Sequence, residues 1–107
     1  MTDIGTLASG WTSTGFHGFK YNKLCLCRGV VTNSNVTGVS MNTFVTLNNS
    51  YKPILIANSI GAGLGVPYQT GGAPFVIHFS TNIVQLKPFS QQDAGTNFSI
   101  CLLWFVN

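Results

Sequence analysis

The sequence predicts an all-β domain, an antiparallel β-sandwich or barrel of the jelly-roll kind, and two observations lead to this fold class. No helical period runs through the 107 residues, and Glu, a common residue of exposed helices, is absent. Short runs of branched and aromatic residues alternate instead with clusters of turn-forming residues. About seven to nine short strands separated in this way are typical of sandwiches and barrels.

The predicted elements follow in chain order. Residues 1–10 contain no β-type run, and we expect them to fray or to be the remnant of a preceding neck, with a single domain over 11–107. Strands are expected over 16–21, 24–32, one or two stretches of 36–47, 54–60, 66–70, 75–80, 83–89 and 97–106. The glycine-rich segment 61–65 is expected to be a flexible break, and 71–74 a tight turn.

The last predicted strand is unusual because its sequence ICLLWFV, residues 100–106, is apolar on both faces. A strand at the surface of a sheet normally alternates apolar and polar residues. One face of this strand is therefore expected to be covered, either by another subunit or by loops of the same chain. The sequence leaves both open.

The composition indicates a polar but nearly uncharged surface. Charged residues make up 7% of the chain, whereas Asn, Ser, Thr and Gln number 34 together. The five cations are dispersed, which argues against a nucleic-acid-binding protein. The apolar surface that so few charges leave over is commonly hidden by self-association. No apolar stretch approaches the ~20 residues of a membrane helix, and the N-terminus is not a signal peptide.

The three cysteines are expected to be free, mostly buried thiols. Cys25 and Cys27 lie two residues apart in a strand, so their side chains point to one face, while Cys101 is distant. This spacing is not that of a zinc site, and a nucleophilic pair with His17 or His78 has no local support. We therefore expect no metal, no cofactor and no catalytic residue.

The order of several short motifs resembles the C-terminal head domain of phage receptor-binding and tail-fibre proteins. In that family a strand of the type Y-x-K-x-x-x-x-x-x-G-x-V precedes L-P-x-G-[YF]-[RK]-P and a later hairpin. The matching positions are Tyr21, Lys23 and Gly29, then Leu47, Tyr51, Lys52 and Pro53, then Ile77, Phe79, Ile83 and Leu86. The likeness runs from Trp11 to the end. Asn48, Ser50 and Asn82 depart from it, and Asn82 replaces the glycine of the hairpin turn.

The resemblance implies a β-sandwich head, usually a homotrimer, at the tip or baseplate of a phage tail. Such a head recognises a saccharide or teichoic-acid-like polymer on the host bacterium and contacts other tail or baseplate proteins. A virion protein is released by host lysis, which agrees with an N-terminus that carries no export signal. The Met1 start fits either a fragment of a longer adhesin or a very short one.

Saccharide binding would use aromatic platforms beside planar polar groups, placed on loops of the sandwich. The candidate saccharide-binding residues are Trp11, His17, Tyr68, Gln69, His78, Gln92 and Asp93. Each has a structural alternative: Trp11 packing the N-terminus, His78 in an interface, and 91–93 in a solvated loop. Tyr51 and Lys52, by contrast, are interpreted as structural, because Pro53 favours extended backbone before it.

The leading hypothesis is thus a non-enzymatic saccharide-binding head. Its alternative is a purely structural trimeric β-cap of a tail or baseplate. An enzyme such as a glycan depolymerase is disfavoured because Asp3 and Asp93 are the only acidic side chains. A two-carboxylate glycosidase needs both groups close together on one site.

Overall fold

The computed structural model describes residues 3–54, 62–67 and 74–106 and confirms the predicted all-β class. The described strands are β1 (Gly5–Leu7), β2 (Trp11–Tyr21), β3 (Leu24–Asn33), β4 (Asn42–Leu47), β5 (Ala62–Pro67), β6 (Phe75–Ser80), β7 (Ile83–Pro88) and β8 (Asn97–Phe105). A 3-10 turn, η1, covers Asn49–Tyr51. Every strand pair is antiparallel.

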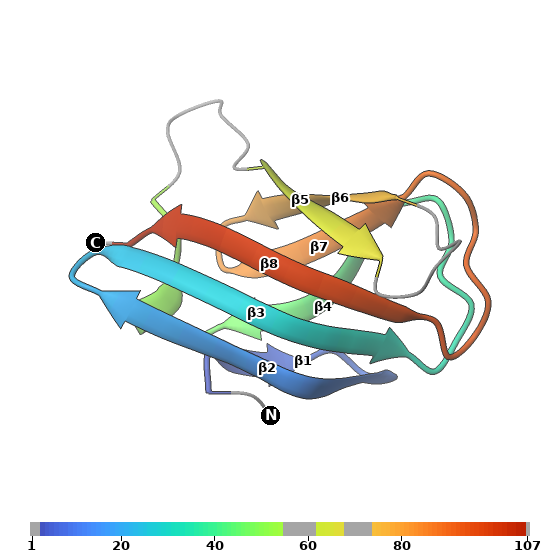
Figure 1. Ribbon diagram of the computed structural model, residues 1–107, viewed down its shortest axis with the longest axis horizontal. Helices are drawn as coiled ribbons and strands as arrows, with labels where there is room; N and C mark the ends of the chain where they lie inside the picture. Colours follow the sequence, from blue (N-terminus) through green and yellow to red (C-terminus); the bar gives the residue numbers. More distant parts are fainter. Residues whose placement is uncertain (1–2, 55–61, 68–73, 107) are drawn as a thin grey trace.

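The strands form two packed layers, as Figure 1 shows. The front layer contains β2, β3 and β8, and the back layer contains β1, β4, β7 and β6. The strand order through both layers is β1-β4-β7-β6-β5-β8-β3-β2, so β5 connects them. Its residues 62–65 pair with β6, whereas Val66 and Pro67 pair with β8.

The glycine-rich segment at 61–65 was expected to be a flexible break, and that expectation was wrong for its described part. Residues 62–65 belong to β5 and pair with His78, Ile77, Val76 and Phe75 of β6. Glycine in a strand often marks a sharp bend where a chain passes from one sheet to another. β5 changes its partner sheet within six residues, so it requires such a bend.

The N-terminal segment was expected either to fray or to be the remnant of a preceding neck, and the structure shows that residues 5–7 form an ordered strand. β1 pairs with β4, and the Ile4 side chain is only 1% exposed. The apolar Ile4 and the neighbouring Leu7 supply enough buried surface to hold a short edge strand in place. The sandwich therefore begins before Trp11.

The core lies between the two layers and is rich in aromatic rings. Phe75 and Phe98 meet edge to face with centroids 5.3 Å apart, and Phe79 packs on Trp104 at 5.4 Å. Trp11 contacts both Phe44 and Phe98 at about 6 Å. Offset and edge-on aromatic contacts of this kind stabilise a core beyond their burial alone.

The predicted strands at 24–32, 75–80, 83–89 and 97–106 are confirmed to within a residue or two. In 36–47 only β4 forms, with an isolated bridge between Thr37 and Gln92. Residues 55–60 of the predicted strand 54–60, and the turn 71–73, lie outside the described residues. In the β6–β7 turn the left-handed residue is Thr81, with φ 56°, and not Asn82 as the motif comparison implied.

Candidate functional site

The outward face of the front layer forms a regular grid because the strand register is continuous. Each row takes one side chain from β2, β3 and β8 in turn. From one end the rows are Tyr21–Leu24–Phe105, Phe19–Leu26–Leu103, His17–Arg28–Cys101, Thr14–Val30–Ser99 and Thr12–Thr32–Asn97. The face therefore passes from apolar through cationic to polar, and we call it the graded face.

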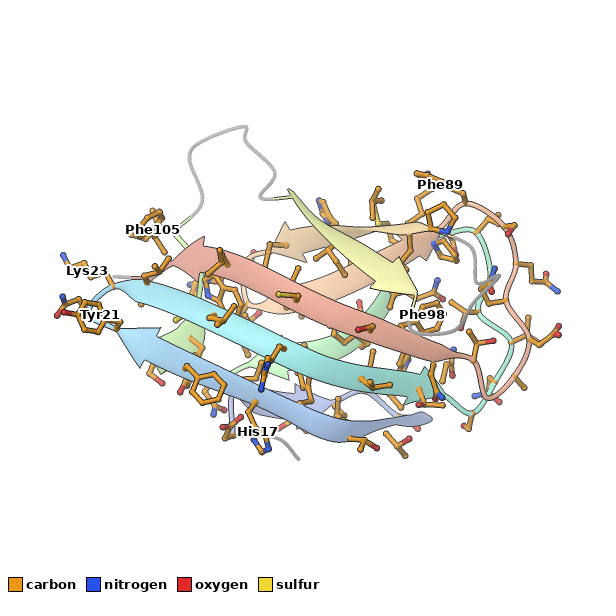
Figure 2. The ribbon with its side chains drawn as sticks, in the orientation of Figure 1. His17, Tyr21, Lys23, Phe89, Phe98 and Phe105 are labelled. Atoms are coloured by element: carbon orange, nitrogen blue, oxygen red, sulfur yellow. The ribbon has the colours of Figure 1, made fainter. Side chains whose placement is uncertain are left out.

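The first two rows make an exposed apolar patch. Tyr21 is 80% exposed, and Leu103 and Phe105 are 65% and 64% exposed. Figure 2 shows Tyr21 and Phe105 at the same end of the front layer, with Lys23 between them. A hollow of about 270 Å³ lies among the six residues Phe19, Lys20, Tyr21, Leu24, Leu26 and Leu103. The apolar outer face of β8, anticipated from the sequence, is thus uncovered within this chain.

A second hollow, of about 440 Å³, lies where the cationic row meets the first polar row. Its lining is Gly15, Arg28, Gly29, Val30, Ser99, Ile100 and Cys101. Arg28 is the only charged residue of this set, and its side chain is exposed. We call this site the Arg28 hollow.

A β-bulge shapes the Arg28 hollow. The register between β2 and β3 shifts after Thr14, so that Gly15 and Phe16 together oppose Gly29. Gly15 and Gly29 have φ values of 60° and 146°, which side-chain-bearing residues rarely adopt. A Cβ atom on Gly29 would collide with backbone atoms of Gly15 and Phe16. Bulges often re-aim strands beside functional sites, and here the bulge leaves bare backbone next to Arg28.

The polar end of the graded face is rich in hydroxyl and amide groups. The Thr32 hydroxyl donates a 2.6 Å hydrogen bond to the side-chain oxygen of Asn97 on the neighbouring strand. Thr12 and Thr14 on β2 are exposed beside it. Such groups bind neutral hydroxyl-rich ligands without requiring charge.

The structure places the sequence-predicted residues at separate positions. Trp11 is 9% exposed and packs in the core, as its structural alternative held, so its ring offers no exposed platform. His17 is exposed on the graded face, where its Nδ1 lies 3.4 Å from the Asp3 carboxylate. Asp3 also accepts a hydrogen bond from the Gly18 backbone N–H, which places it along the outer edge of β2. Tyr68 and Gln69 lie outside the described residues.

His78 lies on the outward face of the back layer, half-buried. The Gln85 amide donates to the Thr43 hydroxyl at 3.0 Å, so its oxygen accepts from His78 Nδ1 at 2.9 Å. The three residues form a hydrogen-bonded row across β6, β7 and β4.

Gln92 and Asp93 lie in the loop between β7 and β8. The Gln92 amide donates to the Ser90 carbonyl and hydroxyl oxygens, and its backbone pairs with Thr37. Asp93 is exposed, and its carbonyl accepts a bond from the Thr96 hydroxyl. Of the predicted residues that the structure describes, His17 alone belongs to the graded face, so these residues are not gathered into one site.

Sequence reasoning missed the residues that the fold does bring together, above all Arg28, Ser99 and Gly15. The alternation of Ser99, Cys101, Leu103 and Phe105 was the available signal, because it places these residues on one face of β8. The sequence signal for the bulge is weaker. It consists of Gly15 and Gly29, which the strand register brings opposite each other.

Two further features bear on chemistry. Cys25 and Cys27 are buried free thiols on one face of β3, as predicted, and Cys101 is a free exposed thiol. Burial raises the pKa of Cys27 to about 12, so the thiol stays neutral at physiological pH. The described residues contain no group of three or more His, Cys, Asp or Glu side chains that could hold a metal ion. They also include no helix long and apolar enough to span a membrane.

The two-layer fold of this chain is similar to that of a solved phage receptor-binding head domain. The solved structure that shows this is the head domain of phage bIL170, described in the context of a common fold for the receptor-binding domains of lactococcal phages. The likeness has a TM-score of 0.69 and covers 99% of this chain and 96% of that one, at 20% sequence identity. No family model and no curated protein matches the sequence. The resemblance read from the motifs is thereby confirmed at the level of the fold.

Proposed function

We propose that the protein is a non-enzymatic receptor-binding head of a phage adhesion device that recognises a saccharide polymer on the host surface. The observation that carries this proposal is the head-domain fold, which extends over nearly the whole chain. The phages named for the similar structure are lactococcal, so lactococci are the first hosts to test. The protein would accordingly act in the virion, at the tail tip or baseplate, with other tail proteins as partners.

A saccharide ligand agrees with the chemistry of the exterior. The polar rows of the graded face offer hydroxyls and amides, groups that match sugar hydroxyls in both donor and acceptor roles. With 7% charged residues, the chain has little to offer a highly charged protein partner. Weak contacts to each sugar unit would be multiplied along a repeating polymer when several heads bind at once.

The homotrimer is supported by the apolar patch of the first two rows. Four of its side chains, Phe19, Tyr21, Leu103 and Phe105, are each more than half exposed. With about 150–250 Å² per aromatic side chain, the patch exposes on the order of 500 Å². An apolar patch of this size often marks an interaction surface, and the occupant that we propose is a second copy of this chain.

A catalytic role is not supported by the carboxylates. Asp3 is engaged by His17 and the Gly18 amide at the edge of β2, whereas Asp93 lies in the β7–β8 loop. The two therefore belong to different parts of the sandwich, while a paired-carboxylate glycosidase holds them about 5–10 Å apart. The chain length of a host polymer should stay unchanged on incubation with the protein.

The test combines mass and binding. Light scattering should give a trimer, and calorimetric titration should show binding to cell-wall polysaccharide from a subset of lactococcal strains. Leu103→Asp should break the trimer because it places a charge in the apolar patch. Val39→Asp, the same change at an exposed loop residue, is the matched control and should leave it intact. A folded trimer that binds polymer from no strain would overturn the proposed function.

A second candidate function, the structural trimeric β-cap, is favoured by one observation, the burial of Trp11. Under that role the trimer forms but the polymer titration stays flat, and the protein instead binds other tail or baseplate proteins. The same two measurements therefore separate the two functions.

A further inference from the structure

In the part of the chain that the structure describes, no carboxylate pairs with the guanidinium of Arg28. Among the side chains that the structure describes, the single ion pair joins His17 to Asp3. No carboxylate lines the hollow around Arg28, and its neighbours across the sheet are His17 and Cys101. An exposed arginine on a flat surface is common. Arg28, by contrast, borders a concave site.

The backbone beside Arg28 is bare as well. Gly15 has open space where a Cβ would lie, and Gly29 has a backbone conformation and surroundings that exclude a side chain. A glycine with open space at its Cβ position, as at Gly15, allows a ligand to approach the main chain closely. Ser99, on the neighbouring strand β8, adds a hydroxyl donor to the lining.

From this juxtaposition we propose that the Arg28 hollow is a binding subsite for an oxyanion, a carboxylate or phosphoryl group carried by a sugar unit. The planar guanidinium presents paired N–H donors that match both groups in a bidentate manner. The volume of about 440 Å³ lies within the ~300–1,000 Å³ of small-molecule sites and holds more than a bare ion. The idea that the anion belongs to a host polymer rests on the proposed function, whereas anion binding in the hollow does not.

The hollow adjoins the apolar patch without overlapping it. Arg28 stands in the third row, directly after the row of Phe19, Leu26 and Leu103. If the patch is covered by a second copy, the hollow stays open at its border. Because the site is open to solvent, binding by one subunit should be weak, and three subunits would raise the avidity.

The test is a titration of the ¹⁵N-labelled protein, at constant ionic strength, with inorganic phosphate, glucose 1-phosphate, glucuronate and uncharged glucose. The amide signals of Gly15, Gly29, Ser99 and Cys101 should shift with at least one charged probe and not with glucose. The ratio of the Kd values for glucose 1-phosphate and glucuronate then distinguishes a phosphoryl from a carboxylate ligand.

Variants assign the effect to the guanidinium. Arg28→Gln should weaken the binding of the charged probes at least tenfold, and Arg28→Lys, which keeps the charge without the fork, should weaken it less. Lys87→Gln is the matched control, because it removes one exposed cation from β7 in the other layer. Since Arg28 is exposed, Arg28→Gln should retain the wild-type melting temperature, which is measured in parallel.

Three results would overturn the inference. In the first, the amide signals of the hollow residues do not shift with any charged probe. In the second, they shift as much with glucose as with the charged probes. In the third, Lys87→Gln weakens binding as much as Arg28→Gln does. A protein that binds host polymer with unmoved hollow amides refutes the subsite alone. Shifted hollow amides with no polymer binding refute the proposed function alone.

Discussion

The indole Nε1 of Trp104 donates a 2.8 Å hydrogen bond to the backbone carbonyl oxygen of Tyr51. This bond joins the end of β8 to the turn η1, which is 53 residues earlier in the chain. The Tyr51 ring in turn lies under the Lys20 ammonium group, with 4.9 Å from Nζ to the ring centroid. The Tyr51-Lys52-Pro53 segment is therefore a structural connection between layers, in agreement with its interpretation from the sequence.

Replacing Trp104 by Phe should destabilise the protein more than the same change at Trp11. Both indoles are buried, so both variants lose similar ring volume. Only Trp104→Phe leaves the Tyr51 carbonyl without its donor, and this should cost about 1 kcal/mol beyond the loss in Trp11→Phe. Urea unfolding of the two variants gives the difference. Equal free energies of unfolding would show that the hydrogen bond contributes nothing net.

Much of the fold could be predicted because a strand with regular apolar alternation can be recognised from its own residues alone. β6 and β7 have this pattern, with alternate residues buried along their length. The glycine-containing part of β5, residues 62–65, could not be predicted, because it carries no apolar pattern and its pairing depends on the distant β6. β1 is a three-residue edge strand whose order depends on Ile4 entering the core.

The candidate site was harder to predict than the fold, because the graded face exists only through register. Arg28 pairs with Cys101, which lies 73 residues later in the sequence, and no local motif indicates this pairing. Trp11 was predicted as a binding aromatic on a loop, but its side chain belongs to the hydrophobic core. Exposed rings such as Tyr21 and Phe105 lie instead on strands, at positions where alternation alone could not tell the inner face from the outer.

Gly29 should be among the least replaceable residues of the chain. Its φ of 146° disfavours any side chain, and an added Cβ would meet the backbone of the bulge rather than a movable side chain. Gly29→Ala is therefore expected to lower the free energy of unfolding by at least about 2 kcal/mol.

Gly38→Ala is the control for this substitution, because Gly38 has open space around its Cβ position. It should change stability by no more than about 0.5 kcal/mol. Thermal melts of both variants, with circular dichroism to verify the fold, provide the comparison. Similar melting temperatures for the two would refute the role assigned to the bulge.

Two turns in the described part of the chain, β2–β3 and β6–β7, allow a test by reciprocal substitution. Asn22 in the β2–β3 turn and Thr81 in the β6–β7 turn both have positive φ, 55° and 56°. Asn tolerates this conformation, whereas a β-branched residue is strained in it. Thr81→Asn should therefore raise the free energy of unfolding by about 0.5–1 kcal/mol, and Asn22→Thr should lower it by about 1 kcal/mol.

Chemical denaturation of both single variants decides this exchange. Both residues are exposed, so neither change alters core packing. A stabilising effect at residue 81 together with a destabilising one at residue 22 is the expected pair of signs. Any other combination would mean that these turns are not limited by backbone strain.

Stability should fall at alkaline pH because of the buried thiols. Burial, helped by the negative charge of Asp3, raises the pKa of Cys27 from its ordinary value of 9.0 to about 12. Burial also raises the pKa values of Cys25 and Tyr51. Each group thus releases its proton from the unfolded chain first. The stabilisation by Cys27 is complete below pH 9 and is lost between pH 9 and 12, by up to about 1.4 kcal/mol per pH unit.

Cys27→Ala tests this origin of the alkaline transition. The variant should lose about 1 kcal/mol at pH 7, since it creates a small cavity, yet its stability should decline less steeply above pH 9. Cys101→Ala is the control, because this thiol is exposed and contributes less than burial and Asp3 to the raised pKa of Cys27, so its pH dependence should stay close to that of the wild type. Urea unfolding under reducing conditions from pH 7 to 11 gives the slopes. A Cys27→Ala slope equal to that of the wild type would place the alkaline sensitivity in groups other than Cys27.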